Sequence, residues 1–197
     1  MYKEVSTKII TILVMAAFLT VPSSSVVQYL HAQSDQGLKD VLNIHNQERG
    51  LVGVQPLTWS DSLAGQAQAY ADHLTTLGVV CTSQGCKPVP PHGAANENIA
   101  LGITLPAEFG VNSPAEFAQM WVDEKFGYNA KTNTCTPVPP SVSCGHYTQM
   151  VWQNTNVVGC GFALGKVPDE VTLSGGGTDF LVCRYSPPGN TPGQAPF

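Results

Sequence analysis

Two histidines and two glutamates between residues 92 and 146 could form a metal or acid–base site: His92, Glu97, Glu124 and His146. Neutral imidazole is a good ligand for zinc and similar divalent ions. Carboxylates can orient such rings by accepting their second N–H group. Two imidazoles would leave metal positions open to water, so we expect weak or exchangeable binding. A metal-bound water beside a carboxylate could in principle hydrolyse a substrate.

Each of these residues also has an ordinary structural explanation when it is taken alone. The stretch HGAANEN at 92–98 can be a polar surface loop. Glu124 either extends an apolar helical stripe, where an unpaired charge would be costly, or lies solvated at a helix end. His146 falls in an alternating run at 146–152 that is typical of a strand. It can therefore be a hydrogen-bonded core residue.

The sequence lacks the motifs of several common hydrolases. It has no HEXXH segment and no Gly-x-Ser-x-Gly elbow, and its cysteines are expected to be bonded rather than nucleophilic. These observations favour a binding cleft over an enzyme. The alternative is a metal-dependent hydrolase or peptidase that uses Glu97 and Glu124.

The first 32 residues are typical of a secretory signal peptide. Lys3 and Lys8 open the segment, and the apolar run at 9–21 is shorter than the roughly 20 residues of a membrane span. Ala32 precedes the expected cleavage site, and the protein would then be secreted. Because Leu30 is not ideal at the −3 position, an uncleaved anchor is the alternative.

The mature chain would be acidic. Cleavage after residue 32 removes two of the nine basic and one of the 14 acidic residues, which leaves seven and 13 and a net charge of −6. Such a domain lacks the basic surface that nucleic acid or anionic lipid requires. We expect one monomeric domain over 33–197, with a core at about 38–188 and an extended tail at 189–197.

The chain has six cysteines, an even number behind a signal peptide. This arrangement predicts disulfides in an oxidising compartment. The spacings do not resemble the paired C-x-x-C pattern of zinc knuckles, the metal-binding alternative. Six cysteines allow fifteen pairings, and their order in the chain cannot choose among them.

Apolar spacing predicts helices at 36–50, 60–78 and 113–129, and Ser60 would be the N-cap of the second. The third is well marked, because Ser113, Pro114 and Glu116 make an N-cap, a first-turn proline and a capping box. We expect residues 79–98 to be irregular. Strands are predicted at the following ranges: 146–153, 157–164 and 179–185. Helices followed by an antiparallel meander indicate an α+β layered domain.

Several segments together resemble the CAP superfamily, and the resemblance covers 36–197. They are HNQERG, PLTWSDSLAGQAQAYA, NENIA, WVDEKFGYN, CGHYTQMVWQNTNVVGCGFA and VCRYSPPGN. The superfamily includes cysteine-rich secretory proteins, insect antigen five and the plant pathogenesis-related class-one proteins, of which the plant branch looks closest. The resemblance implies a three-layer α-β-α sandwich with a central antiparallel sheet and a large cleft.

In this family two histidines and two glutamates converge in the cleft. His92 matches the first histidine, and Glu97 matches the glutamate of the Gly-Glu-Asn motif. Glu124 matches the Trp-x-x-Glu glutamate, and His146 matches the histidine of the Gly-His-Tyr/Phe-Thr motif. The chain departs from the pattern at Asn96, which replaces the motif glycine, and in a shorter loop from His92 to Glu97.

The resemblance also narrows the disulfides. It implies Cys135–Cys144, which closes a proline-rich loop, and Cys160–Cys183, which joins neighbouring strands. Cys86 has no obvious family counterpart, so a local Cys81–Cys86 bridge is the simplest completion. The glycines of Gly159-Cys160-Gly161 would let the next strand pass closely.

The resemblance implies a secreted lipid-binding, sterol-binding or defence-type protein. Zinc or another divalent cation would bind weakly at His92 and His146. The loop TPVPPSV, 136–142, resembles the binding loop of sterol-binding relatives, although it lacks the expected aromatic residues. The alternatives are the hydrolase above and an extracellular protein-interaction module that acts through its loops and tail.

Overall fold

The computed structural model describes residues 23–77, 79–82, 85–88, 92–104, 113–141, 143–166 and 177–197. Within these ranges the side chains of 23–34, 79–82, 85–88, 104 and 166 are not described. The predicted signal run at 9–21 lies outside the described residues. In the described part of the chain, no helix combines the length and apolar character needed to cross a bilayer.

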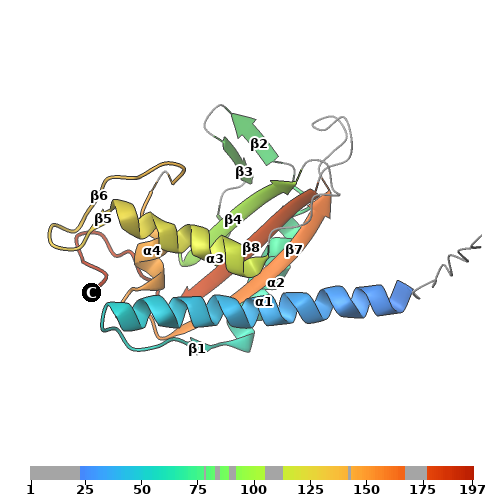
Figure 1. Ribbon diagram of the computed structural model, residues 1–197, viewed down its shortest axis with the longest axis horizontal. Helices are drawn as coiled ribbons and strands as arrows, with labels where there is room; N and C mark the ends of the chain where they lie inside the picture. The colour runs from blue at the N-terminus through green and yellow to red at the C-terminus, as the bar shows by residue number, and fades with distance from the viewer. Residues whose placement is uncertain are drawn as a thin grey trace, which may run out of the picture.

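A four-stranded sheet forms the centre of the molecule, in the order β1-β7-β8-β4 (Figure 1). Its long strands are β4 (Glu97–Thr104), β7 (Val157–Lys166) and β8 (Gly177–Ser186), which pair antiparallel. The short β1 (Thr58–Trp59) pairs parallel with β7, which is the one exception among these strands to the predicted antiparallel sheet. In the β4–β8 register Glu97 lies opposite Arg184.

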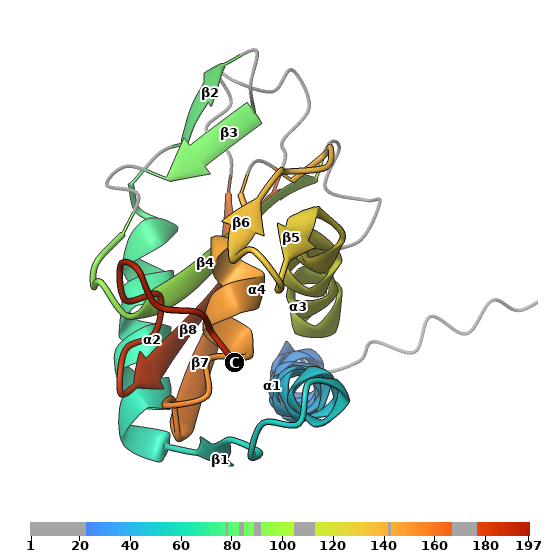
Figure 2. The same cartoon turned by 90° about the vertical axis from the view of Figure 1, so that its left-hand side faces the viewer.

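Helices cover both faces of the sheet (Figure 2). One face carries α2 (Asp61–Leu74) over a buried cluster that includes Ala71, Phe180 and Val182. The other face carries the following helices: α1 (Ser23–Leu51), α3 (Pro114–Asp123), the 3₁₀ turn η2 (Glu124–Gly127) and α4 (Gly145–Met150). Their cluster includes Val41, Trp121 and Met150. This arrangement confirms the predicted three-layer α+β sandwich.

Two small hairpins stand beside the sandwich. One pairs β2 (Val79–Thr82) with β3 (Gly85–Pro88), and the other pairs β5 (Tyr128–Asn129) with β6 (Thr134–Cys135). The first hairpin lies in the stretch that the sequence predicted to be irregular, and that prediction was wrong.

Local capping begins two of the helices as predicted. The Ser113 side chain accepts the Glu116 N–H while the Glu116 carboxylate accepts the Ser113 N–H, which completes the capping box of α3. Ser60 caps α2 by accepting the Leu63 N–H. The helical spacing of Phe117, Met120 and Trp121 predicts one inward-facing stripe on α3, but Met120 is 52% exposed.

The predicted strand at 146–153 is wrong, because residues 145–150 form the helix α4. Its alternating polar and apolar residues suggested a strand, but a helix this short depends on contacts from elsewhere in the chain. Residues 97–104, for which the sequence predicted no strand, form the edge strand β4. The other two predicted strands are confirmed as β7 and β8.

The glycines of β7 face α2 rather than a neighbouring strand. A Cβ on Gly159 would lie 2.2 Å from the Ala64 nitrogen, and one on Gly161 would lie 2.3 Å from the Gln68 backbone. Gln68 also exchanges hydrogen bonds with the Phe162 backbone. The close approach predicted for this Gly-Cys-Gly stretch is therefore made by a helix.

Two of the expected disulfides are present, Cys135–Cys144 and Cys160–Cys183. The second joins register partners on β7 and β8. Cys81 and Cys86 are register partners in the β2–β3 hairpin, but their side chains lie outside the described set, so that bridge stays a prediction. The tail has no regular structure, yet it is held to the domain, since the Gln153 N–H donates to the Pro196 carbonyl.

Candidate functional site

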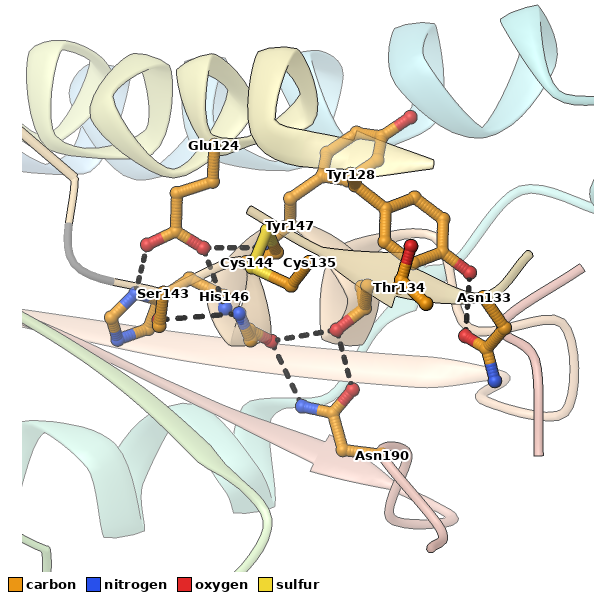
Figure 3. The surroundings of a disulfide bond; sticks show 12 residues. Glu124, Tyr128, Asn133, Thr134, Cys135, Ser143, Cys144, His146, Tyr147 and Asn190 are labelled. Atoms are coloured by element: carbon orange, nitrogen blue, oxygen red, sulfur yellow. Dashed lines mark hydrogen bonds and ion pairs between the residues drawn. A yellow bond between two sulfur atoms is a disulfide. The ribbon is translucent and has the colours of Figure 1, made fainter. Parts of the chain in front are cut away.

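Glu124 holds the first turn of α4 (Figure 3). One carboxylate oxygen accepts the backbone N–H groups of His146 and Tyr147, at 2.9 and 3.1 Å. The other lies 2.7 Å from His146 Nδ1. Trp121 stacks on the His146 ring, with centroids 5.8 Å apart. A carboxylate from another element therefore caps this helix and also fixes the histidine ring.

Arg49 holds the opposite end of the same helix. Its guanidinium is buried and donates to the carbonyls of Met150, Trp152 and Thr155 at 2.8 to 3.0 Å, while its Nε donates to the Gln55 carbonyl. Burial lowers the pKa of Arg49 to about 10, so it remains charged at neutral pH. A cation at the C-terminal end and an anion at the N-terminal end both suit the helix dipole.

The second histidine–glutamate pair is built on β4. Glu97 Oε1 lies 3.5 Å from His92 Nδ1 and accepts the Gly93 N–H, while Oε2 accepts from Arg184 Nε at 3.2 Å. Burial alone would raise the pKa of Glu97. Hydrogen bonds from His92, Ala94 and Gly93, together with the charge of Arg184, outweigh that effect and hold the pKa below its ordinary value.

The loop before Glu97 is shaped by its neighbours. Gly93 packs on the Tyr70 ring of α2, where a Cβ would lie 2.6 Å from two ring carbons. Asn96 exchanges hydrogen bonds with the backbone of Tyr185. The residue that replaces the family's motif glycine thus extends the pairing of β4 with β8.

A buried polar chain links α1 to the site. The His45 ring bridges the Val41 carbonyl and the Tyr185 hydroxyl, at 2.7 and 2.8 Å. Asn98 donates to the Tyr185 hydroxyl and to the His146 carbonyl, both at 3.0 Å. Burial lowers the pKa of His45 to about 4 and raises that of Tyr185, so both groups are neutral at pH 7.

Three of the four predicted site residues line one cavity of about 410 Å³. They are His92, Glu97 and His146, and Glu124 lies behind the His146 ring. The remaining lining is mostly small or polar: Ala94, Ala95, Asn98, Ser143, Gly145 and Asn190. Asn190 donates to the Gly145 carbonyl at 2.8 Å, which fixes the start of the tail at the cavity wall.

The orientation of the two histidine rings decides whether they could hold a metal ion. In both pairs a carboxylate lies near Nδ1, at 2.7 Å for His146 and 3.5 Å for His92. Nδ1–H donation to the carboxylate leaves the Nε2 lone pair for a cation. Among the described side chains, no cluster of three or more His, Cys, Asp or Glu residues could enclose a metal. The described side chains therefore form no closed structural site, and the two imidazoles that line the cavity are the remaining candidates for an open one.

Arg49 and Arg184 were missed by the sequence reasoning. Arginines that donate to backbone carbonyls or to a cross-strand glutamate carry no local sequence signature. Arg184 could have been found from its register opposite Glu97 once β4 was recognised as a strand.

Comparison with known proteins identifies the family. The model of the cysteine-rich secretory protein family, CAP, matches residues 42–185. Pathogenesis-related protein 1B of Nicotiana tabacum is 38% identical over 91% of this chain and 88% of its own length. Pathogenesis-related protein 1 of Arabidopsis thaliana is 37% identical over 88% of this chain and 89% of its own length.

The fold has solved relatives as well. The structure of the venom allergen-like protein 4 of Schistosoma mansoni aligns with a TM-score of 0.50 at 21% identity, over 81% of this chain and 94% of that one. An identity this low supports the shared fold and nothing more specific. The family model and the plant relatives identify more than the fold. The chain belongs to the CAP family, in the branch of the pathogenesis-related class-one proteins.

Proposed function

We propose that the protein is a secreted, defence-type binding protein whose cleft holds a divalent cation such as zinc at His92 and His146. The observation that supports this most is that both rings line one cavity, each with a carboxylate on its Nδ1 side. When bound, the cation would supply open coordination positions for a ligand. Glu124 and Glu97 orient the rings, and the Trp121 stack keeps His146 in place.

Calorimetric titration of metal-free protein with zinc tests this proposal. We expect binding that weakens at least about tenfold in His92→Gln and in His146→Gln, since each variant removes one of two ligands. His73→Gln is the matched control, because His73 is exposed on α2 and lies outside the cavity lining. No heat of binding to the wild type, or wild-type affinity in both cleft variants, would overturn the cation site.

Secretion is supported by the family and by the architecture of α1. Among the described side chains of α1, the buried positions begin at Gly37, so cleavage after Ala32 would keep the packed part of the helix. The defence role is supported by the similarity to pathogenesis-related proteins. Expression of the full chain in a secretory host should give protein in the medium that begins at Gln33. Uncleaved protein that still carries residues 1–32 and is found in the membrane fraction would contradict this.

A small lipid such as a sterol is the second proposed ligand, and it would bind outside the polar cavity. Residues 131–140 are all exposed, and within the disulfide-closed loop Val138 offers an apolar surface. The loop lies against η2, where the Thr136 N–H donates to the Gly127 carbonyl and the neighbouring Phe126 is exposed.

A fluorescent sterol titration tests this ligand. Val138→Asp should weaken binding several-fold, because a carboxylate in an apolar contact is costly. Leu164→Asp introduces the same charge at an exposed apolar residue of β7 and should have no effect. Equal sterol affinity in wild type and Val138→Asp would reject the loop as the binding surface.

A further inference from the structure

The two histidine–glutamate pairs differ in what balances the carboxylate charge. Glu97 forms an ion pair with Arg184, whose side chain is only 15% exposed, while the Glu97 carboxylate is fully buried. Glu124 has backbone N–H groups and the His146 ring as its partners. Among the described residues, neither a lysine nor an arginine forms an ion pair with it.

The charge of Arg184 is held in place from the α2 side. Its guanidinium lies 5.5 Å from the centroid of the Tyr70 ring, in the geometry of a cation–π contact. Its second nitrogen lies 3.4 Å from the Gln66 side-chain oxygen. Because Tyr70 also supports Gly93, one helix positions both the cation and the loop that carries His92.

A fixed cation beside a candidate ligand set opposes the binding of a second cation. Two like charges repel across a partly buried site, and solvent screens the repulsion only in part. The Glu97 half of the cavity is electrically balanced before any ion arrives, whereas no lysine or arginine among the described residues balances the carboxylate charge of Glu124. A divalent cation would therefore be drawn toward His146.

We propose that Arg184 limits the affinity of the cleft for divalent cations and directs them to the His146 side of the cavity. This inference rests on the proposed cation site. Arg184 is a positioning residue in this scheme, since it acts through Glu97 and is not itself a ligand. The positive charge of Arg184 keeps the cleft a weak cation site, which suits reversible binding of the cation.

Arg184→Gln removes the charge and keeps an amide that can donate to Glu97. Its zinc affinity should rise about fivefold, the size expected for one partly screened charge. The Gly93 and Ala94 N–H groups still hold the carboxylate in this variant. Arg184→Lys keeps the charge but loses the planar guanidinium, and its affinity should stay near the wild-type value. A merely structural role of Arg184 would instead weaken binding in both variants.

Lys39→Gln is the matched control, because it removes one positive charge from an exposed position on α1 outside the cavity lining. It should leave the zinc affinity unchanged. Raising the salt from 50 mM to 500 mM should reduce the difference between Arg184→Gln and the wild type, because salt screens the charge of Arg184.

The outcomes of the zinc titrations distinguish the role of Arg184 from the cation site on which it rests. Zinc binding to wild type and Arg184→Gln with equal affinity would overturn the role of Arg184 and leave the cation site standing. Absence of binding in both would overturn both proposals. Binding in Arg184→Gln alone would support the role of Arg184 and overturn the cation site of the wild-type protein.

Discussion

The two histidine–glutamate pairs of this cleft have the same composition and different construction. His146 is gripped through its ring, its backbone N–H and the stacked Trp121, and its side chain is 29% exposed. His92 is 49% exposed and meets Glu97 at 3.5 Å. One pair is part of a helix that is clamped at both ends, whereas the other lies on a loop supported by one aromatic ring. Equal residue types at a site thus do not imply equal roles.

Replacing the two glutamates one at a time should expose this difference most strongly. Glu124→Gln should lower zinc affinity roughly 10- to 100-fold, the usual range when the partner of a metal-ligating histidine is lost. Glu97→Gln should cost less, because its contact with His92 is longer and the ring is more exposed. Titration calorimetry measures both, with urea unfolding to show that each variant is folded. An equal or larger loss in Glu97→Gln would break the comparison.

Acid should separate the pairs as well. His45 has a pKa of about 4 in the folded protein against an ordinary value of 6.5. The contribution of its neutral ring to the free energy of unfolding is therefore complete above pH 6.5 and is lost as the pH falls from 6.5 to 4. The expected loss is about 3 kcal/mol of unfolding free energy. Through Tyr185 and Asn98 it would act on the α4 side.

Glu97 has the opposite arrangement. Its pKa is depressed below the ordinary 4.5, so its contribution is present above pH 4.5 and is lost only as the pH falls through the lower, folded value. Urea unfolding between pH 7 and 4 should therefore show a decline that His45→Gln largely removes. Hydrogen exchange should rise first in α4. Earlier exchange at residues 93–97 would contradict this order.

The contact between the His92 loop and the Tyr70 ring can be tested by adding one methyl group at Gly93. Gly93→Ala should destabilise the domain by about 1 to 3 kcal/mol, because the new Cβ would meet the Tyr70 ring. Gly65→Ala is the matched control, since a Cβ there has open space on α2 and should stabilise slightly. Adding Tyr70→Ala should cancel part of the Gly93→Ala loss in thermal unfolding. Additive losses would show that the ring is not the obstacle.

The smallest effect is expected where the tail meets α4. The Thr148 hydroxyl lies 2.7 Å from the Asn190 side-chain oxygen, so Thr148→Val should cost about 1 kcal/mol of unfolding free energy. Thr191→Val changes an exposed threonine of the same tail, and we expect no loss. Equal stability of both variants in urea would show that the hydroxyl contributes nothing to this wall of the cavity.

Local signals predicted the parts of the fold that local contacts build. The capping box at Ser113 and the N-cap at Ser60 begin real helices, and the β7–β8 pair and its disulfide followed from apolar runs and the family resemblance. The helix α4 was missed because its caps, Glu124 and Arg49, lie far from it in the sequence.

The sequence predicted which four residues would make up the candidate site, but it did not predict the charged partner of Glu97. His92, Glu97, Glu124 and His146 came from the family motifs, which specify residue types and order. Arg184 is visible only through the register that places it opposite Glu97, and that register depends on β4, which was not predicted. A cross-strand charge pair cannot be found before both strands are known.

The missing methyl groups of Gly159 and Gly161 let the backbone of α2 lie directly on β7. The same helix carries Tyr70 and Gln66, which hold the guanidinium of Arg184. The distance between α2 and β7 at these glycines therefore helps to determine where the positive charge of Arg184 lies beside the cleft. A side chain added there would push the helix outward and move Tyr70 and Gln66 relative to Arg184, without any substitution among the cavity residues.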